Sequence, residues 1–216
     1  NSVADVFSGV KNPSGKLTMT FPVDYNNHPS AANFPGFPAH DPKEVFYEEG
    51  IYVGYRYFNT FGVKPSYEFG FGQSYTTFEY ADLKLSTTRF TDELEVSVKV
   101  TNTGAVAGKE VVQVYVAAPA QLADKPSEEL KAFGKTEVLE PGQSETLSFK
   151  LTAKDLASFI DAQSAWVAEK GTYTVKIGAS SLDIQLKEDF TIAEDITAEK
   201  VNNAFDLDAE METLKN

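Results

Sequence analysis

A strict alternation of apolar and polar side chains occupies residues 94–100, LEVSVKV. Successive side chains along a β-strand point to opposite faces of a sheet, so the alternation predicts a strand with one buried face. Similar apolar runs on both sides of it, separated by turn signals such as Asn102-Thr103-Gly104 and Pro141-Gly142, predict further strands. These further strands are expected near residues 78–85, 112–116, 129–138, 147–151, 172–179 and 184–192.

This series of strands predicts one mainly β unit over residues 77–193. About seven strands in about 115 residues are typical of a fibronectin type III-like or immunoglobulin-like β-sandwich. Residues 152–159, TAKDLASF, interrupt the pattern with a Thr and an acid three residues later, which indicates a short capped helical turn. For Trp166, the only tryptophan, packing at the edge or in the core of the sandwich is favoured over stacking on a carbohydrate.

The region before the sandwich, residues 1–76, has little regular periodicity. A short helix is expected in VADVF, residues 3–7, and a short strand at residues 17–21, before a loop at 22–42 that holds five prolines. Residues 47–80 then contain twelve Tyr or Phe and five Gly. Ordering such a segment costs entropy, and so much ring surface is unfavourable in water. We therefore expect a partial α/β-domain remnant and a long aromatic linker packed against other protein.

The charge of the chain limits its partners. Its 216 residues carry a formal net charge of −13, from 32 acidic and 19 basic residues. Binding to a phosphate backbone requires clustered Lys and Arg, so nucleic acid is not an expected partner. Part of the acidity is local, because residues 194–216 hold seven acidic residues and two Lys. An extended strap or a partly disordered acidic tail is expected there.

The absence of Cys rules out a disulfide framework and a Cys-ligated metal, but it does not assign a compartment. No window approaches the roughly 18 apolar residues of a membrane span, and the first residues lack the pattern of a signal peptide. A soluble chain without a membrane partner is therefore expected. A periplasmic or secreted location is favoured over a cytoplasmic one.

Few residues are spaced for chemistry, and no metal or cofactor site is predicted. The adjacent carboxylates Glu128-Glu129 would point to opposite faces of a strand, so they would not share a substrate. His28 and His40 lie twelve residues apart in the proline-rich loop, a spacing that specifies no metal geometry. Tyr55, Arg56 and Tyr57 could stack on and hydrogen-bond a sugar or carboxylate, but an anchor between domains is the favoured interpretation.

Several motifs, in this order, resemble the C-terminal region of glycoside hydrolase family 3 enzymes, which include many β-glucosidases and β-xylosidases. Residues 12–22, NPSGKLTMTFP, resemble a strand near the end of the family's α/β sandwich domain. Residues 47–58 and 67–80 resemble the linker that leads into the last domain of these enzymes. The fibronectin type III-like domain that closes these enzymes is similar to residues 100–116, 129–133, 141–142 and 166–180.

The resemblance implies a parent enzyme that hydrolyses terminal β-linked sugars with retention of configuration, through a glycosyl-enzyme intermediate. In this family the nucleophilic Asp lies in a barrel domain, and the acid/base carboxylate usually lies earlier in the α/β sandwich domain. The chain is therefore expected to begin after both and to hold no catalytic residue. Its expected partners are the remaining domains of the same enzyme and, through them, an oligosaccharide or aryl β-glycoside.

Two further expectations follow from the resemblance and from the distribution of rings. The rim of the parent's cleft is expected to include five residues of the proline-rich loop and the linker: His40, Asp41, Tyr47, Tyr55 and Arg56. The alternative function is a non-catalytic carbohydrate-binding or adhesion β-sandwich, of which the binding module would carry a flat row of exposed aromatic side chains. The rings concentrate before Asp82 instead, which favours the structural part of a hydrolase.

Overall fold

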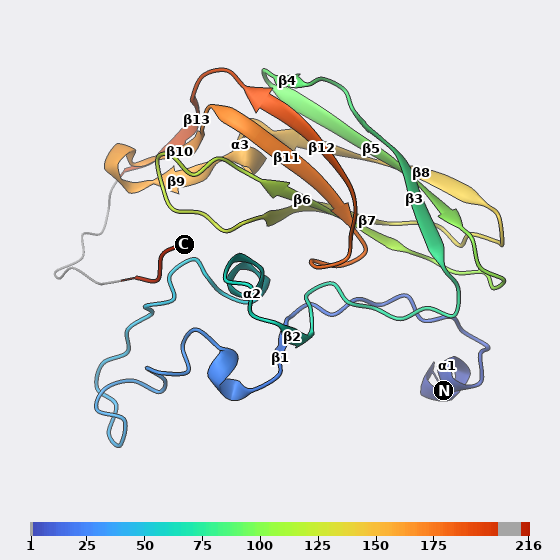
Figure 1. Ribbon diagram of the computed structural model, residues 1–216, viewed down its shortest axis with the longest axis horizontal. Coiled ribbons are helices and arrows are strands. Elements are labelled where there is room, and N and C mark those ends of the chain that lie inside the picture. The colour runs from blue at the N-terminus through green and yellow to red at the C-terminus, as the bar shows by residue number, and fades with distance from the viewer. Residues whose placement is uncertain (1, 203–212) are drawn as a thin grey trace.

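The computed structural model describes residues 2–202 and 213–216. Its largest part is a β-sandwich of two packed sheets, and the first 76 residues run as an extended layer along one side of it (Figure 1). The expected strap of the acidic tail would be held by spaced apolar residues, and three of these six, Phe205, Leu207 and Met211, lie outside the described residues. None of the described helices is long and apolar enough to cross a membrane.

The smaller sheet of the sandwich has the strand order β3-β5-β8, formed by Phe78–Leu85, Glu93–Asn102 and Ser144–Thr152. Along β5 every second side chain, beginning with Leu94, is buried, as the alternating sequence predicts. Antiparallel pairing with β8 places Val96 opposite Phe149. Both of these side chains belong to the hydrophobic core between the two sheets.

The larger sheet has the strand order β4-β12-β11-β6-β7. Tyr173 of β11 stacks on Phe190 of β12 with 5.2 Å between the ring centroids, and Val175 lies opposite Val116 of β6. All four side chains belong to the same core as those of the smaller sheet, so the predicted β-sandwich is confirmed. In sheet order the strands are Arg89–Phe90, Ile184–Ile192, Gly171–Gly178, Val111–Ala117 and Glu129–Lys135.

A small three-stranded sheet closes one end of the sandwich beside helix α3 (Ala153–Leu156). α3 is the capped turn that the sequence predicts, because Thr152 and Asp155 form a capping box. The sequence does not predict the small sheet, since strands of three to five residues are too short to show an alternation. Its order is β9-β10-β13, with β9 at Ser158–Ile160, the 3-10 turn η2 at Asp161–Gln163, β10 at Ala165–Ala168 and β13 at Ile196–Lys200.

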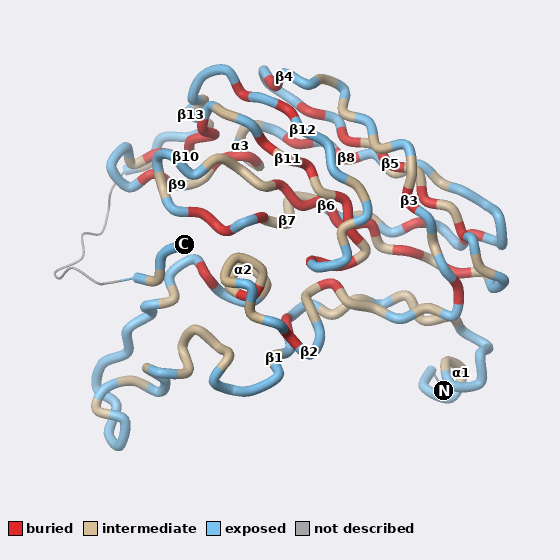
Figure 2. The backbone as a smooth tube through the Cα atoms, viewed as in Figure 1, coloured by how far each residue is buried: buried red, intermediate tan, exposed pale blue. Residues whose placement is uncertain are grey.

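The layer of residues 2–76 contains only short elements. The expected helix at residues 3–7 is present within α1, but of the expected strand at 17–21 only Phe21 belongs to a strand, β1, which pairs with β2. Figure 2 shows that most of this layer is exposed or half-buried, and neither core cluster of the described residues includes a side chain from it. Its elements are α1 (Ser2–Phe7), β1 (Phe21–Pro22), η1 (Tyr25–Asn27), α2 (Tyr55–Thr60) and β2 (Pro65–Tyr67).

Strand β6 shows how the aromatic linker is packed, because it is buried on both faces. Val112, Val114 and Val116 face the core of the sandwich, whereas Gln113 and Tyr115 face the linker. The ring of Tyr115 lies 5.8 Å from that of Tyr55, and Gln113 Nε2 donates hydrogen bonds to the carbonyl oxygens of Gly70 and Ala179. The linker therefore packs against β6 on the outer face of the larger sheet.

Candidate functional site

Helix α2 fixes the linker to the sandwich. The hydroxyl oxygen of Tyr55 accepts a hydrogen bond from Leu130 N at 2.8 Å, and its ring lies 4.9 Å from that of Phe69. Burial raises the pKa of Tyr55, so the phenol stays protonated at neutral pH. One residue further on, Arg56 Nη2 lies 3.0 Å from Glu129 Oε1 of β7. These contacts join α2 to β7, and the interpretation of Tyr55 and Arg56 as an anchor between domains stays a prediction.

The neighbouring carboxylates Glu128 and Glu129 point to different partners, as expected for adjacent residues of an extended chain. Asn59 Nδ2 of α2 donates to Glu128 Oε1 at 2.6 Å, and Lys176 Nζ of β11 lies 2.5 Å from Glu128 Oε2. Glu129 instead pairs with Arg56 on one side and with Lys131 on the other. Both carboxylates therefore act as structural ion-pair partners and do not form a couple facing one substrate.

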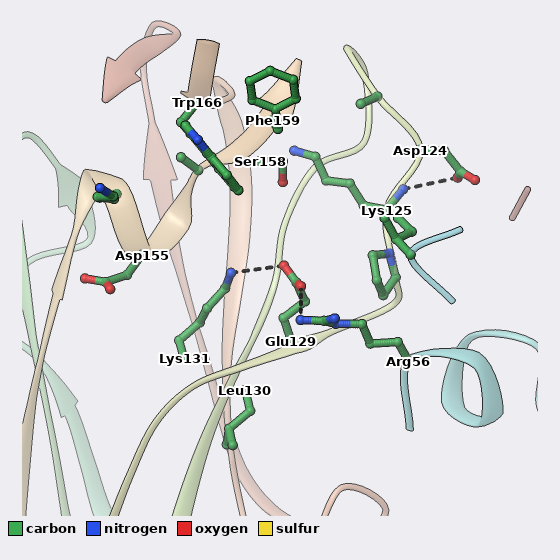
Figure 3. Close-up of a pocket in the computed structure, with 15 residues that line it drawn as sticks. Arg56, Asp124, Lys125, Glu129, Leu130, Lys131, Asp155, Ser158, Phe159 and Trp166 are labelled. Carbon is green, nitrogen blue, oxygen red and sulfur yellow. Dashed lines mark hydrogen bonds and ion pairs between the residues drawn. The ribbon is translucent and has the colours of Figure 1, made fainter. Parts of the chain in front are cut away.

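A pocket of about 510 Å³ lies between α2, the segment that leads into β7, and the small end sheet. Phe159 of β9 and Trp166 of β10 lie opposite each other, their ring centroids are 5.6 Å apart, and each is 38% exposed. Across the pocket, Glu129 accepts a hydrogen bond from Lys131 Nζ at 3.0 Å and pairs with Arg56 (Figure 3). The pocket therefore has one aromatic wall and one charged wall.

The charged wall keeps its ionisation at neutral pH. Burial alone would raise the pKa of Glu129, but the charge and hydrogen bond of Lys131, together with the charge of Arg56, lower it below the ordinary value. On the rim, Lys154 Nζ lies 2.6 Å from Glu199 Oε2, and this hydrogen bond raises the pKa of Lys154. Arg56 and Lys131 therefore share the carboxylate of Glu129, and Lys154 on the rim has a carboxylate partner of its own.

A second groove, of about 680 Å³, runs along the first 76 residues and is lined mainly by apolar side chains. Phe21 and Tyr67 meet edge to face in it with 6.4 Å between their centroids, and Phe7 and Phe71 contribute further ring surface. Among the described residues, sixteen of the 23 exposed large hydrophobic side chains lie in residues 1–76. The layer therefore leaves a large apolar surface in contact with solvent.

The five residues predicted for a cleft rim do not form one cluster. Tyr55 and Arg56 lie on α2 and contact the sandwich, whereas His40, Asp41 and Tyr47 are exposed in the loop before α2. Their role at a cleft stays a prediction. In the part of the chain that the structure describes, no group of three or more His, Asp or Glu is placed to hold a metal ion.

The aromatic wall is the feature that the sequence reveals least. Phe159 ends the segment interpreted as a capped turn, and only the reversal through η2 brings it opposite Trp166. The favoured interpretation of Trp166, packing at the edge of the sandwich, agrees with its place on the end sheet. No spacing in the sequence indicates that the two rings lie together. A single tryptophan beside a short apolar run is only a weak signal of an aromatic site.

Two family models match the chain. Residues 1–55 match the glycosyl hydrolase family 3 C-terminal domain, and residues 110–181 match the fibronectin type III-like domain. Their order along the chain is the order of the motifs found in the sequence. The residues matched by the second model include the whole of β6, β7, β8 and β11, which lie in both sheets of the sandwich.

Known proteins extend the match over nearly the whole chain. The thermostable β-glucosidase B of Acetivibrio thermocellus is 42% identical over 208 residues, which are 94% of this chain and 27% of that protein. The probable β-glucosidase I of Aspergillus fumigatus is 41% identical over 199 residues, 89% of this chain and 23% of that protein. The solved structure of β-glucosidase 3B from Thermotoga neapolitana with glucose has a TM-score of 0.84 and 54% identity, over 90% of this chain and 26% of its own.

The chain thus spans about a quarter of the length of the relatives it matches. The two family models, the identity to β-glucosidases and the shared fold agree with one another. This chain therefore corresponds to the C-terminal region of glycoside hydrolase family 3 enzymes, with part of the family's C-terminal domain followed by the fibronectin type III-like domain.

Proposed function

We propose that this chain is the structural C-terminal part of a retaining glycoside hydrolase of the β-glucosidase type, which cleaves terminal β-linked sugars. In this proposal the chain holds neither catalytic carboxylate and stabilises the barrel and α/β domains that do. The relatives it matches are named β-glucosidases, and their remaining length leaves room for those domains. The substrate is an oligosaccharide or an aryl β-glycoside bound by the whole enzyme.

The observation that carries the proposal is the apolar surface of residues 1–76. Phe21 and Tyr67 are 41% and 49% exposed although their rings meet in the apolar groove. Water-exposed apolar area forgoes roughly 25 cal/mol per Å² that burial would contribute, and large patches of this kind mark contact surfaces. The preceding domains of the same enzyme are the occupant that the comparison with longer relatives favours.

The domain boundaries of the proposal follow the change in packing along the chain. Residues 1–76 would form the end of the α/β sandwich domain and the linker, 77–193 the fibronectin type III-like domain, and 194–216 the acidic tail. The anchor of Tyr55 and Arg56 on β7 supports a fixed angle between the first two parts. The exposed loop with His40, Asp41 and Tyr47 is the part that we propose reaches the rim of the parent's cleft.

Reconstitution tests the proposal. The β-glucosidase 3B of Thermotoga neapolitana, truncated before the region that matches this chain, would supply the missing domains. We expect this chain alone to leave a chromogenic aryl β-glucoside intact, and the mixture of both parts to hydrolyse it. The double variant Phe21→Asp/Tyr67→Asp is expected to weaken association of the parts by at least about tenfold, since two charges would be buried in an apolar contact.

Val138→Asp is the matched control, because Val138 is an equally exposed apolar residue, at 51%, but lies in the sandwich. It is expected to leave association unchanged. Hydrolysis by the chain alone would contradict the absence of a catalytic pair. Failure of the two parts to associate in gel filtration, or association that Phe21→Asp/Tyr67→Asp leaves unchanged, would overturn the groove as the contact surface.

A further inference from the structure

The pocket with the aromatic wall has a combination of features that neither the core of the sandwich nor the linker requires. Trp166 and Phe159 keep more than a third of their surface exposed although they lie next to a hydrophobic cluster that includes Val167. Trp166 alternates along β10 with the buried Ala165 and Val167, so its ring points away from that cluster, and both rings line the pocket of about 510 Å³ (Figure 3). Pockets of roughly 300–1,000 Å³ are the usual size for small-ligand sites.

The charges of the pocket indicate that its ligand is neutral. Arg56 and Lys131 both pair with Glu129, at 3.0 Å each. Lys154 pairs with Glu199, and the deeper Lys125 pairs with Glu169. Among the described residues, each lining Lys or Arg therefore has a carboxylate partner, so an anionic ligand would have to break one of these pairs. The two lining carboxylates outside these pairs, Asp124 and Asp155, already accept hydrogen bonds from backbone N–H groups.

The same ion pairs can still hydrogen-bond a ligand rich in hydroxyl groups. A Lys ammonium has three donors, and Lys131 directs one of them to Glu129. A carboxylate has about four acceptor positions, so Glu129 retains free ones after pairing with Arg56 and Lys131. Hydroxyl groups both donate and accept, and they can use these positions without displacing an ion pair.

We propose that the pocket formed by Trp166, Phe159 and the Arg56–Glu129–Lys131 network binds a neutral saccharide. The flat apolar face of a pyranose ring would lie against the Trp166 ring, and its hydroxyl groups would meet Glu129 and Lys131. This proposal goes beyond the structural role of the chain and does not depend on it, because the binding residues belong to the chain itself. Reconstitution could fail while the saccharide still binds, and the reverse is equally measurable.

Trp166 provides a direct test, because it is the only tryptophan of the chain and reports on this pocket alone. The whole chain is titrated with cellotetraose, maltotetraose and glucose while tryptophan emission is recorded, and isothermal calorimetry gives the dissociation constant independently. Cellotetraose is the first probe because the relatives are named β-glucosidases. We expect a saturable change of emission and a matching calorimetric isotherm, with the linkage preference read from the two tetrasaccharides.

Variants then assign the binding to the pocket. Phe159→Ala and Glu129→Gln are expected to raise the dissociation constant, Phe159→Ala by about tenfold, because the first removes one ring of the aromatic wall and the second removes the carboxylate charge that holds Arg56 and Lys131 in place. Trp166→Ala is expected to abolish the isotherm, and Trp166→Phe, which keeps a ring, to weaken binding less. The matched control is Phe7→Ala, which removes an 86% exposed ring of α1 outside this pocket and is expected to change nothing.

Two results would overturn the proposal. The first is the absence of a saturable signal with all three saccharides in both fluorescence and calorimetry. The second is binding that Phe159→Ala and Trp166→Phe leave as strong as in the unaltered chain, which would place the saccharide elsewhere. Circular dichroism of each variant separates loss of binding from loss of fold. Should Trp166→Ala fail to fold, the graded pair Phe159→Ala and Trp166→Phe decides the question.

Discussion

Lys125 Nζ lies 2.5 Å from Glu169 Oε1, and the two side chains are only 5% and 1% exposed. Glu169 Oε2 also accepts hydrogen bonds from the backbone N–H groups of Gln121 and Leu122. The carbonyl oxygen of Lys125 in turn accepts a hydrogen bond from the hydroxyl of Tyr52 in the linker. The buried ion pair therefore joins the β6–β7 connection to Glu169, between β10 and β11, and the backbone of Lys125 joins the same connection to the linker.

Removing one partner of this pair is expected to destabilise the fold strongly. Lys125→Met leaves the Glu169 carboxylate buried without a cation, and the expected loss in the free energy of unfolding is about 3–5 kcal/mol. Glu169→Gln keeps a carbonyl oxygen for the two N–H groups but strands the Lys125 charge, so a loss of similar size is expected. Urea denaturation followed by circular dichroism measures both.

The exposed pair of Glu93 and Lys150 is the control for this prediction. Glu93→Gln removes a charge of the same kind at a site where water screens it, and the expected loss is below about 1 kcal/mol. A loss for Lys125→Met no larger than for Glu93→Gln would contradict the prediction.

Gly70 is expected to tolerate no side chain. Its φ is +81°, and a Cβ there would lie 2.0 Å from Gln113 Oε1. Gln113 cannot move cheaply, because its amide holds Gly70 and Ala179. Gly142 has a φ of +80° but open space around it, so Gly142→Ala measures the backbone penalty alone, about 1–2 kcal/mol. Gly70→Ala is expected to lose clearly more stability than Gly142→Ala in urea denaturation. Equal losses would show that the linker backbone can move away from Gln113 without a further loss of stability.

The local sequence pattern predicts the strands of the sandwich well, because buried and exposed side chains alternate along strands such as β5. β12 spans Ile184–Ile192, the range expected from the sequence, and β5 extends the expected run by a residue or two at each end. The capped turn is equally local, since Thr152 and Asp155 meet within three residues. In these segments the information that decides the structure lies within a few neighbouring residues.

Contacts between distant segments could not be predicted in the same way. α2 was not expected, because its aromatic residues show more than one apolar face, and it is held by Glu128 and Glu129 about 70 residues later. The pocket likewise depends on the register that sets Phe159 opposite Trp166. Individual residues such as Trp166 and Arg56 stand out in the sequence, but the two opposite walls of the pocket to which they belong are set by tertiary packing.

Asn102 is expected to be among the least replaceable polar residues of the sandwich. It is fully buried, its amide N–H groups donate to the carbonyl oxygens of Val106 and Leu139, and its amide oxygen accepts from Gly104 N and the Thr76 hydroxyl. Asn102→Ala leaves these groups without partners, and a loss of about 3 kcal/mol or more is expected.

Thermal and urea denaturation measure this loss. Asn102→Asp is expected to be no better than Asn102→Ala, because a carboxylate cannot donate to the two carbonyl groups and adds a buried charge. Asn26→Ala is the control, since the Asn26 amide bonds an exposed neighbour, Asp24. Comparable losses at Asn102 and Asn26 would show that the buried network contributes little.

The ionisation of Glu129 makes the stability of the linker anchor depend on pH. Its pKa is lower in the folded chain than when unfolded, because Lys131 and Arg56 outweigh the effect of burial. The unfolded chain therefore takes up this proton more readily, and the stabilisation is complete above about pH 4.3, the ordinary glutamate pKa, and is lost as the pH falls toward the folded value. We expect the difference in unfolding free energy between the unaltered chain and Glu129→Gln to shrink on acidification from about pH 7 to about pH 3. Lys131→Met, which removes the main cause of the shift, should flatten this dependence, and a difference that stays constant over the range would refute the assignment.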